Sequence, residues 1–238
     1  MQLKPITHEG IPTALQKAER YRLLNESSAA ESICLDVLEI DPTNQDALVS
    51  LLLAITVVGE VRPTRLTLRD GAKANDVFAC TGALGASRAG LAQLREEIAL
   101  SGELREEALR AYRTPAARWR EGLWLGASVN VHAMMDISDG LSTDLRRLCE
   151  RSGVGACVDG VPIAPSALAA AEALHVDPTA YALAGGEDFE LLVAVAPRAF
   201  DHLASRYRAR FGRTLERIGT ATIESALVAR IAGRDEPI

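Results

Sequence analysis

Two carboxylates and a hydroxyl stand close together in the middle of the chain, at Asp136, Ser138 and Asp139. An apolar, strand-like run ends there and an amphipathic pattern begins. Three leucines then repeat at i, i+4 and i+7, which places them on one face of a helix: Leu141, Leu145 and Leu148. We therefore expect Ser138 or Asp139 to be the N-cap of this helix, with Gly140 in its first turn.

Such a helix start suits the binding of a phosphate group. Free backbone N–H groups and the positive end of the helix dipole both favour an anion at that position. Asp136 and Asp139 could hold a magnesium ion that bridges to the phosphate. The simpler interpretation is a strand end followed by an N-capped helix, with both acids in solvent.

A second acidic motif lies between Gly185 and Leu192. Gly185 and Gly186 allow positive φ and a close approach of the backbone to a ligand. Glu187 and Asp188 follow directly, ahead of an apolar strand. Taken alone, these acids read as solubilising turn residues. Taken together with the first motif, they are candidates for the substrate side of a site.

Other chemical patterns in the chain are weaker. The small-residue loop from Gly82 to Gly85 precedes a helix and could cradle an anion, but tight packing explains it equally well. The four histidines are isolated from one another and from the cysteines, so no metal-ligand spacing is present. A G-x-S-x-G nucleophile elbow does not occur in the sequence. An aromatic and basic stripe does not occur either, so we expect no nucleic-acid partner.

The composition is that of a soluble globular protein. Hydrophobic residues make up 48% of the 238 positions, and the net charge of −6 gives no reason to expect nucleic acid or an anionic membrane as a partner. The longest nearly apolar run, residues 47–58, is shorter than the roughly 20 residues that a bilayer span needs. The four cysteines form no C-x-x-C pair and read as buried free thiols. With no secretory leader evident, we expect a cytoplasmic location.

The N-terminal part shows a helical pattern that a turn interrupts at residues 41–44, where Asp-Pro-Thr-Asn disfavours helix. The spacing resembles one tetratricopeptide repeat followed by the first helix of another. The matching positions are Tyr21, Ala30, Cys34, Val37 and Pro42. A plain helical hairpin is the alternative. One repeat cannot bury both of its faces, so residues 11–52 are expected to pack on the rest of the chain or on a protein partner.

From residue 53 onward, strand-like and helical segments alternate, which predicts an α/β layered domain with a mostly covered sheet. We expect domains at residues 1–52 and 53–238. The predicted strands are residues 55–61, 66–68, 77–81, 132–137, 154–158, 189–195, 215–222 and 226–231. The predicted helices are residues 87–100, 103–111, 119–129, 139–151, 166–174, 178–183 and 197–211.

The order of the motifs resembles the thiamine-monophosphate kinase family, which belongs to the aminoimidazole ribonucleotide synthetase superfamily. The resemblance extends from about Leu53 to Arg230 and covers only the family's C-terminal part. Its motifs are residues 58–61, 66–73, 81–85, 135–141, 152–156, 185–191 and 217–219.

The resemblance implies transfer of the ATP γ-phosphoryl group to thiamine monophosphate, with magnesium ions, giving thiamine diphosphate. Asp136 and Asp139 match magnesium-binding aspartates. Ser138 and Arg69 match ATP contacts, and Glu187 matches an acid that touches the thiamine phosphate. No residue is assigned a covalent catalytic role, because phosphoryl transfer depends on positioning and charge neutralisation.

The chain also departs from the family. The helical hairpin stands where the family has a domain with further acidic magnesium ligands, a phosphate-binding loop and its dimer contact. The aromatic-Asp-His-Phe segment that closes the family's sequences is not found before Ile238. Three interpretations stay open: a kinase, alone or completed by another subunit; a non-catalytic nucleotide-binding or scaffold protein; and an artificial junction near residue 53.

Overall fold

The structure is a computed structural model that describes residues 7–23, 27–54, 66–231 and 234–237. The chain divides into two compact units, Met1–Val61 and Arg62–Ile238. The strand predicted over residues 55–61 lies outside the described residues. The boundary expected between residues 52 and 53 falls inside a helix that continues to Ala54.

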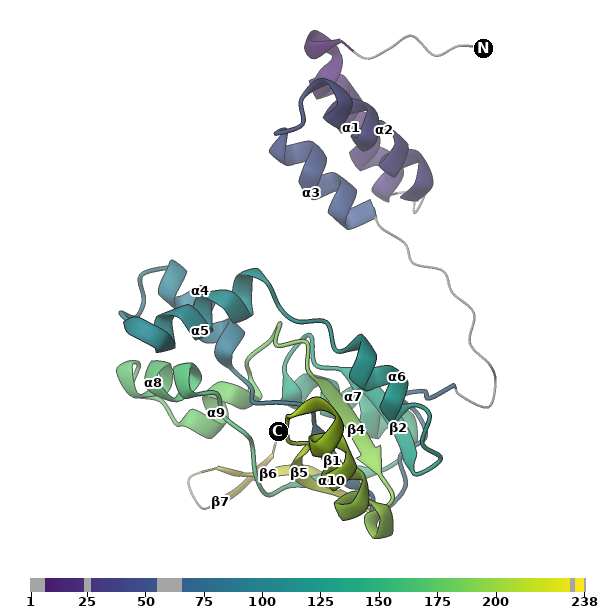
Figure 1. Cartoon of the computed structure of the whole chain (residues 1–238), viewed down its shortest axis with the longest axis vertical. Helices are drawn as coiled ribbons and strands as arrows, with labels where there is room; N and C mark the ends of the chain where they lie inside the picture. Colours follow the sequence, from purple (N-terminus) through teal and green to yellow (C-terminus); the bar gives the residue numbers. More distant parts are fainter. Residues whose placement is uncertain (1–6, 24–26, 55–65, 232–233, 238) are drawn as a thin grey trace. The chain divides into compact units, whose positions relative to one another are not determined.

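The first unit is helical (Figure 1). It contains the 3-10 helix η1 (His8–Gly10) and the helices α1 (Ile11–Leu23), α2 (Ser27–Ile40) and α3 (Gln45–Ala54). The predicted turn is present: the Asp41 carboxylate accepts hydrogen bonds from Thr43 and from the Asn44 side chain. Asn44 in turn accepts one from the N–H of Ala47, which fixes the start of α3. The assignment of these helices to a tetratricopeptide repeat stays a prediction.

The second unit is built on a seven-stranded sheet in the order β2-β4-β1-β5-β3-β6-β7. Its strands are β1 (Val77–Cys80), β2 (Val131–Asp136), β3 (Gly155–Val158), β4 (Leu191–Val195), β5 (Glu216–Thr222), β6 (Leu227–Ile231) and β7 (Arg234–Pro237). Neighbouring strands are antiparallel except β3 and β6. The α/β layered fold class is confirmed. Residues 66–68 were expected to form a strand and do not, although the Leu68 carbonyl accepts a hydrogen bond from Met134 N–H.

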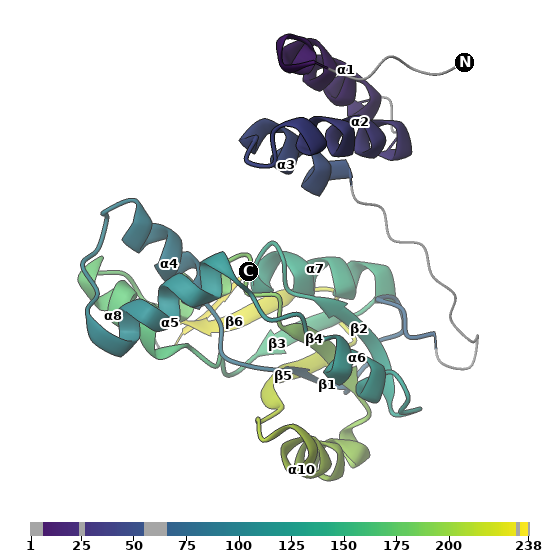
Figure 2. The ribbon, with the colours of Figure 1, turned by 45° about the horizontal axis from the view of Figure 1, so that its top comes forward.

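Helices cover both faces of this sheet. They are α4 (Ala86–Leu94), α5 (Gly102–Arg113), α6 (Trp119–Leu125), α7 (Leu141–Ser152), α8 (Pro165–Ala173), α9 (Pro178–Leu183) and α10 (Phe200–Phe211), with a 3-10 turn η3 (Pro197–Ala199) before α10. Figure 2 shows α7 and α10 on opposite sides of the sheet. Side chains in β1 alternate accordingly: Phe78 and Cys80 join the core under α7, and Ala79 joins the core under α6 and α10.

A separate, alanine-rich core joins α4, α5, α8 and α9. The backbones of α4 and α5 approach closely, because a Cβ atom added at Gly90 would lie 2.2 Å from the Ala108 carbonyl oxygen. This packing holds the first turn of α4 beside the segment that leads from α9 to β4. The fold thereby positions two of the chemical motifs against each other.

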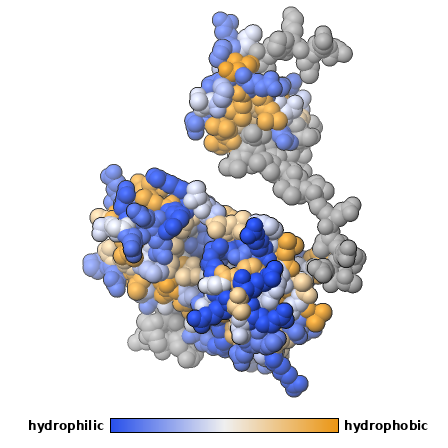
Figure 3. All heavy atoms as spheres, in the orientation of Figure 1, coloured by the Kyte–Doolittle hydropathy of each residue, from blue (hydrophilic) through white to orange (hydrophobic). Residues whose placement is uncertain are grey.

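Hydrophilic residues cover much of the second unit on the face drawn in Figure 3, with smaller hydrophobic patches between them. Among the described helices, none combines the length and apolar character needed to cross a membrane. The cysteines are free thiols: Cys34, Cys80 and Cys149 are buried as expected, whereas Cys157 is partly exposed.

Candidate functional site

The structure brings the two acidic motifs together at one end of the paired strands β2 and β4. Asp136, the last residue of β2, pairs with Leu191, the first residue of β4. The contact continues beyond both strands, because the N–H of Glu187 donates to the Ser138 carbonyl at 2.7 Å and the N–H of Phe189 donates to the Ile137 carbonyl at 2.9 Å. Asp136, Ser138, Asp139 and Glu187 therefore lie on adjoining segments, although about fifty positions separate the motifs in the chain.

The predicted N-cap of α7 was wrong. Helix α7 begins at Leu141 and its N-cap is Gly140, which has φ +105°. A side chain at Gly140 would lie 3.2 Å from the carbonyl oxygens of Leu183 and Gly185, so glycine satisfies both the dihedral angle and the close approach. Asp139 and Ser138 lie one and two residues before this N-cap, outside the helix.

A buried carboxylate organises the loop that Ser138 and Asp139 occupy. Asp144 lies in the first turn of α7 with no exposed side-chain surface, and it accepts hydrogen bonds from the N–H groups of Ser138 at 3.0 Å and Asp139 at 2.9 Å. These two N–H groups are thus bound within the protein. An anion at this site would be held by other groups, including metal ions on the flanking aspartates.

The flanking aspartates are accessible but not equivalent. Asp136 is exposed, and the half-exposed Asp139 forms an ion pair with Arg147, which also contacts Asp144 at 3.0 Å. No group of three or more potential metal-ligating side chains occurs in the part of the chain that the structure describes. A divalent ion here would have at most these two carboxylates from the described chain, which matches Mg²⁺ sites completed by water and phosphate oxygens.

Removing the Arg147 cation should free Asp139 for a metal ion. We expect Arg147→Gln to strengthen Mg²⁺ binding by up to about fivefold, the range typical of an exposed ion pair. Mg²⁺ titration by calorimetry measures the change. Arg146→Gln is the matched control, because Arg146 makes no ion pair with any described residue. Equal affinities in the two variants would contradict competition between Arg147 and the metal.

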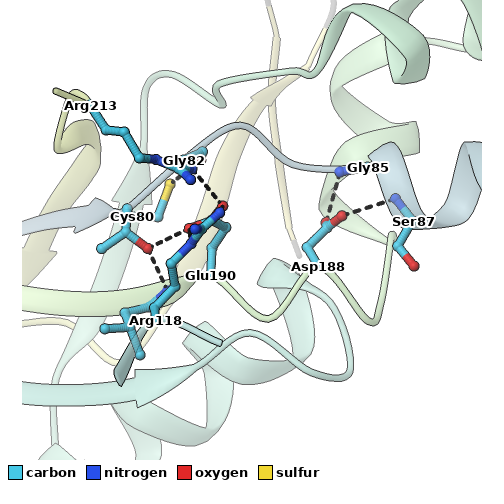
Figure 4. Close-up of polar contacts among 10 residues, drawn as sticks. Cys80, Gly82, Gly85, Ser87, Arg118, Asp188, Glu190 and Arg213 are labelled. Carbon is cyan, nitrogen blue, oxygen red and sulfur yellow. Dashed lines mark hydrogen bonds and ion pairs between the residues drawn. The ribbon is translucent and has the colours of Figure 1, made fainter. Parts of the chain in front are cut away.

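The loop from Gly82 to Gly85 binds an anionic group, and that group is the side-chain carboxylate of Asp188. The Asp188 carboxylate accepts hydrogen bonds from the N–H groups of Gly85 at 2.7 Å and Ser87 at 3.2 Å, at the start of α4 (Figure 4). Gly85 has φ +88°, which few other residues adopt. Burial raises the pKa of Asp188 to about 6, although the two N–H bonds act in the opposite direction.

The buried carboxylate of Glu190 is surrounded by hydrogen-bond donors, and we call it and its partners Thr81, Arg118 and Arg213 the Glu190 cluster (Figure 4). The Glu190 side chain is 6% exposed and accepts two hydrogen bonds from Arg118, at 2.7 and 2.8 Å, and one from Arg213 at 2.8 Å. The Thr81 hydroxyl donates a further bond at 2.6 Å. Burial acts to raise the pKa of Glu190, but its partners outweigh burial and hold the pKa below its usual value.

Sequence patterns did not reveal this cluster. Arg118 lies 72 positions from Glu190, in the segment between α5 and α6, and Arg213 lies 23 positions away, after α10. No local spacing links them. The one available signal was the acid itself, which precedes a strand that is otherwise apolar.

Arg69 does not join the group formed by the other predicted site residues. Its carbonyl accepts a hydrogen bond from the Ser152 hydroxyl, at the C-terminal end of α7. Ser138 and Asp139 precede the N-terminal end of the same 12-residue helix, roughly 18 Å away along its axis. The side chain of Arg69 is exposed.

Comparisons with known proteins show the family to which the second unit belongs. A family model described as AIR synthase related protein, C-terminal domain, matches residues 73–231. The thiamine-monophosphate kinase of Synechococcus elongatus is 31% identical over 189 residues, covering 77% of this chain and 55% of the relative. The enzyme of the same name from Mycobacterium tuberculosis is 38% identical over 144 residues, covering 59% and 42%.

A solved structure, AaThiL complexed with AMPPCP and TMP, superposes with a TM-score of 0.58 at 28% identity. The match covers 71% of this chain and 52% of that one. The chain thus spans about half the length of the relatives that it matches.

Proposed function

The chain belongs to the family of AIR synthase related proteins through its C-terminal domain, residues 73–231, and from this we propose that it takes part in the ATP- and Mg²⁺-dependent phosphorylation of thiamine monophosphate to thiamine diphosphate. One observation carries the proposal. The fold joins the loop that holds Asp136, Ser138 and Asp139 to the turn that holds Glu187, through two backbone hydrogen bonds. Solvated acids in unrelated turns would not need this pairing.

Each residue of the joined motifs has a proposed task. Asp136 and Asp139 hold Mg²⁺, which when bound neutralises and orients the transferring phosphates. Ser138 contacts the nucleotide, and Glu187 contacts the thiamine phosphate. The buried Asp144 keeps the backbone of Ser138 and Asp139 in place, so that these side chains face the ligand without local rearrangement.

Arg69 is proposed as a separate nucleotide contact. Its distance from the joined motifs along α7 means that it would act on a different part of the nucleotide than Ser138, or only after movement of the segment that carries it. Nucleotide affinity that is unchanged in Arg69→Ala would remove Arg69 from the site.

We further propose that this chain supplies only part of the complete site. Two carboxylates cannot by themselves neutralise an ATP triphosphate and its transition state, and the chain spans about half the length of its relatives. Another subunit would then provide the remaining phosphate contacts. The helical residues 11–52 are the proposed surface for a protein partner, and a cytoplasmic location is part of the same proposal.

The test is a calorimetric titration of the full chain with AMPPCP, with and without Mg²⁺, followed by thiamine monophosphate. We expect Mg²⁺-dependent nucleotide binding and, after it, binding of thiamine monophosphate. Formation of thiamine diphosphate from ATP then tells whether the chain alone completes the reaction. Binding without turnover would support a partial site. No nucleotide binding at millimolar concentration would overturn the proposal and leave the scaffold interpretation.

A further inference from the structure

The turn between α9 and β4 has an unfavourable backbone conformation on both sides of Asp188. Glu187 has φ +64° and Phe189 has φ +50°. Residues with a Cβ atom are disfavoured in this left-handed region and persist there only when their surroundings hold them.

Contacts on two flanks restrain the turn. On one flank, the N–H groups of Glu187 and Phe189 donate to the loop before α7, at 2.7 and 2.9 Å. On the other flank, the Asp188 side chain accepts the N–H groups of Gly85 and Ser87 at the start of α4. The backbone is therefore tied to the loop between β2 and α7. The Asp188 side chain, between the two strained residues, is tied to the start of α4 (Figure 4).

We propose that Asp188 is a positioning residue, whose bond to the first turn of α4 fixes the left-handed backbone at Glu187 and so sets the direction of the Glu187 side chain. The proposal rests on the proposed function only where it assigns Glu187 to the thiamine phosphate. It distinguishes the two adjacent acids: Glu187 faces the ligand, and Asp188 holds Glu187.

The burial of Asp188 supports this division of roles. Glu187 is exposed, as a solubilising turn residue would be, but Asp188 is partly buried and its pKa is raised to about 6. An ionised carboxylate in such surroundings is unfavourable unless hydrogen bonds compensate. A turn that needed only a soluble acid would leave this side chain in water.

Amide hydrogen exchange of the full chain, followed by NMR, tests the positioning directly. In Asp188→Ala we expect exchange at the N–H groups of Glu187 and Phe189 to rise by about tenfold, because one flank of the turn is released. Asp188→Asn keeps one acceptor oxygen and should restore part of the protection. Asp177→Ala is the matched control: Asp177 also accepts a backbone N–H at a helix start, from Ala180 at 2.9 Å, but on α9.

A second measurement connects positioning with ligand binding. Asp188→Ala should weaken the affinity for thiamine monophosphate by about tenfold, because Glu187 is displaced. It should leave the affinity for Mg²⁺-AMPPCP within about twofold, because Asp144 still holds the backbone of Ser138 and Asp139. A general loss of structure would lower both affinities. Unchanged exchange at Glu187 in Asp188→Ala would overturn the proposal. If the wild-type chain binds no thiamine monophosphate, the proposed function fails, while the exchange result still decides the role of Asp188.

Discussion

Replacing Glu190 with alanine is expected to lower the free energy of unfolding of the second unit by about 3–5 kcal/mol. The substitution removes the shared acceptor of Arg118, Arg213 and Thr81. Arg118 is only 15% exposed, so its cation would stay largely buried without a partner. Breaking a buried ion pair from one side costs far more than removing an exposed one.

Urea unfolding followed by tryptophan fluorescence measures this change. Both tryptophans of the chain, Trp119 and Trp124, lie in α6, so the signal reports on the second unit. Glu97→Ala is the matched control, because the ion pair of Glu97 with Arg95 spans 3.9 Å between half-exposed side chains. We expect its effect to stay within about 0.5 kcal/mol. Similar losses in the free energy of unfolding of the two variants would contradict the proposed contribution of the Glu190 cluster to stability.

The lowered pKa of Glu190 predicts that the free energy of unfolding falls as the solution becomes acidic. The pKa of Glu190 is lower in the folded protein than its usual value, because Arg118, Thr81 and Arg213 favour the ionised form. The folded state therefore binds this proton less readily than the unfolded state. The stability that Glu190 contributes is fully present above its usual pKa and is lost as the pH falls through its lowered folded pKa. Glu190→Gln should flatten the acid limb of the stability curve.

The second large effect is expected on ligand binding. Replacing Asp136 and Asp139 together by asparagine should weaken Mg²⁺-dependent binding of AMPPCP by about a hundredfold. Asparagine keeps the size of each side chain but removes the two negative charges that would attract the metal. Stability should change little, because Asp136 is exposed and Asp139 is half-exposed.

The control for this experiment is another exposed aspartate that is paired with an arginine. Asp159 accepts two hydrogen bonds from Arg217, at 2.6 and 2.8 Å, in the same unit. Asp159→Asn should leave nucleotide affinity unchanged. Binding that survives the Asp136 and Asp139 substitutions, or that does not depend on Mg²⁺, would place the nucleotide elsewhere and contradict the proposed metal site.

The sequence by itself determined the periodic elements and the position of the acidic motifs at their ends. Leu141, Leu145 and Leu148 are all fully buried, as their spacing on one helical face required. The turn at residues 41–44 and most of the strands of the second unit followed from local preferences in the same way. These features depend on neighbours within a few positions, and such neighbours can be read directly from the chain.

Only the tertiary structure decided which groups meet. Glycine suits the N-cap of α7 because Gly140 has φ +105° and because a Cβ atom there would lie 3.2 Å from the carbonyl oxygens of Leu183 and Gly185. Asp188 bound the start of α4, although 103 positions separate it from Gly85. Any carboxylate can satisfy a backbone N–H or an arginine, so local spacing carries no information about which one does. The packing of α4 on α5 and the pairing of β2 with β4 determine which carboxylate meets which N–H group.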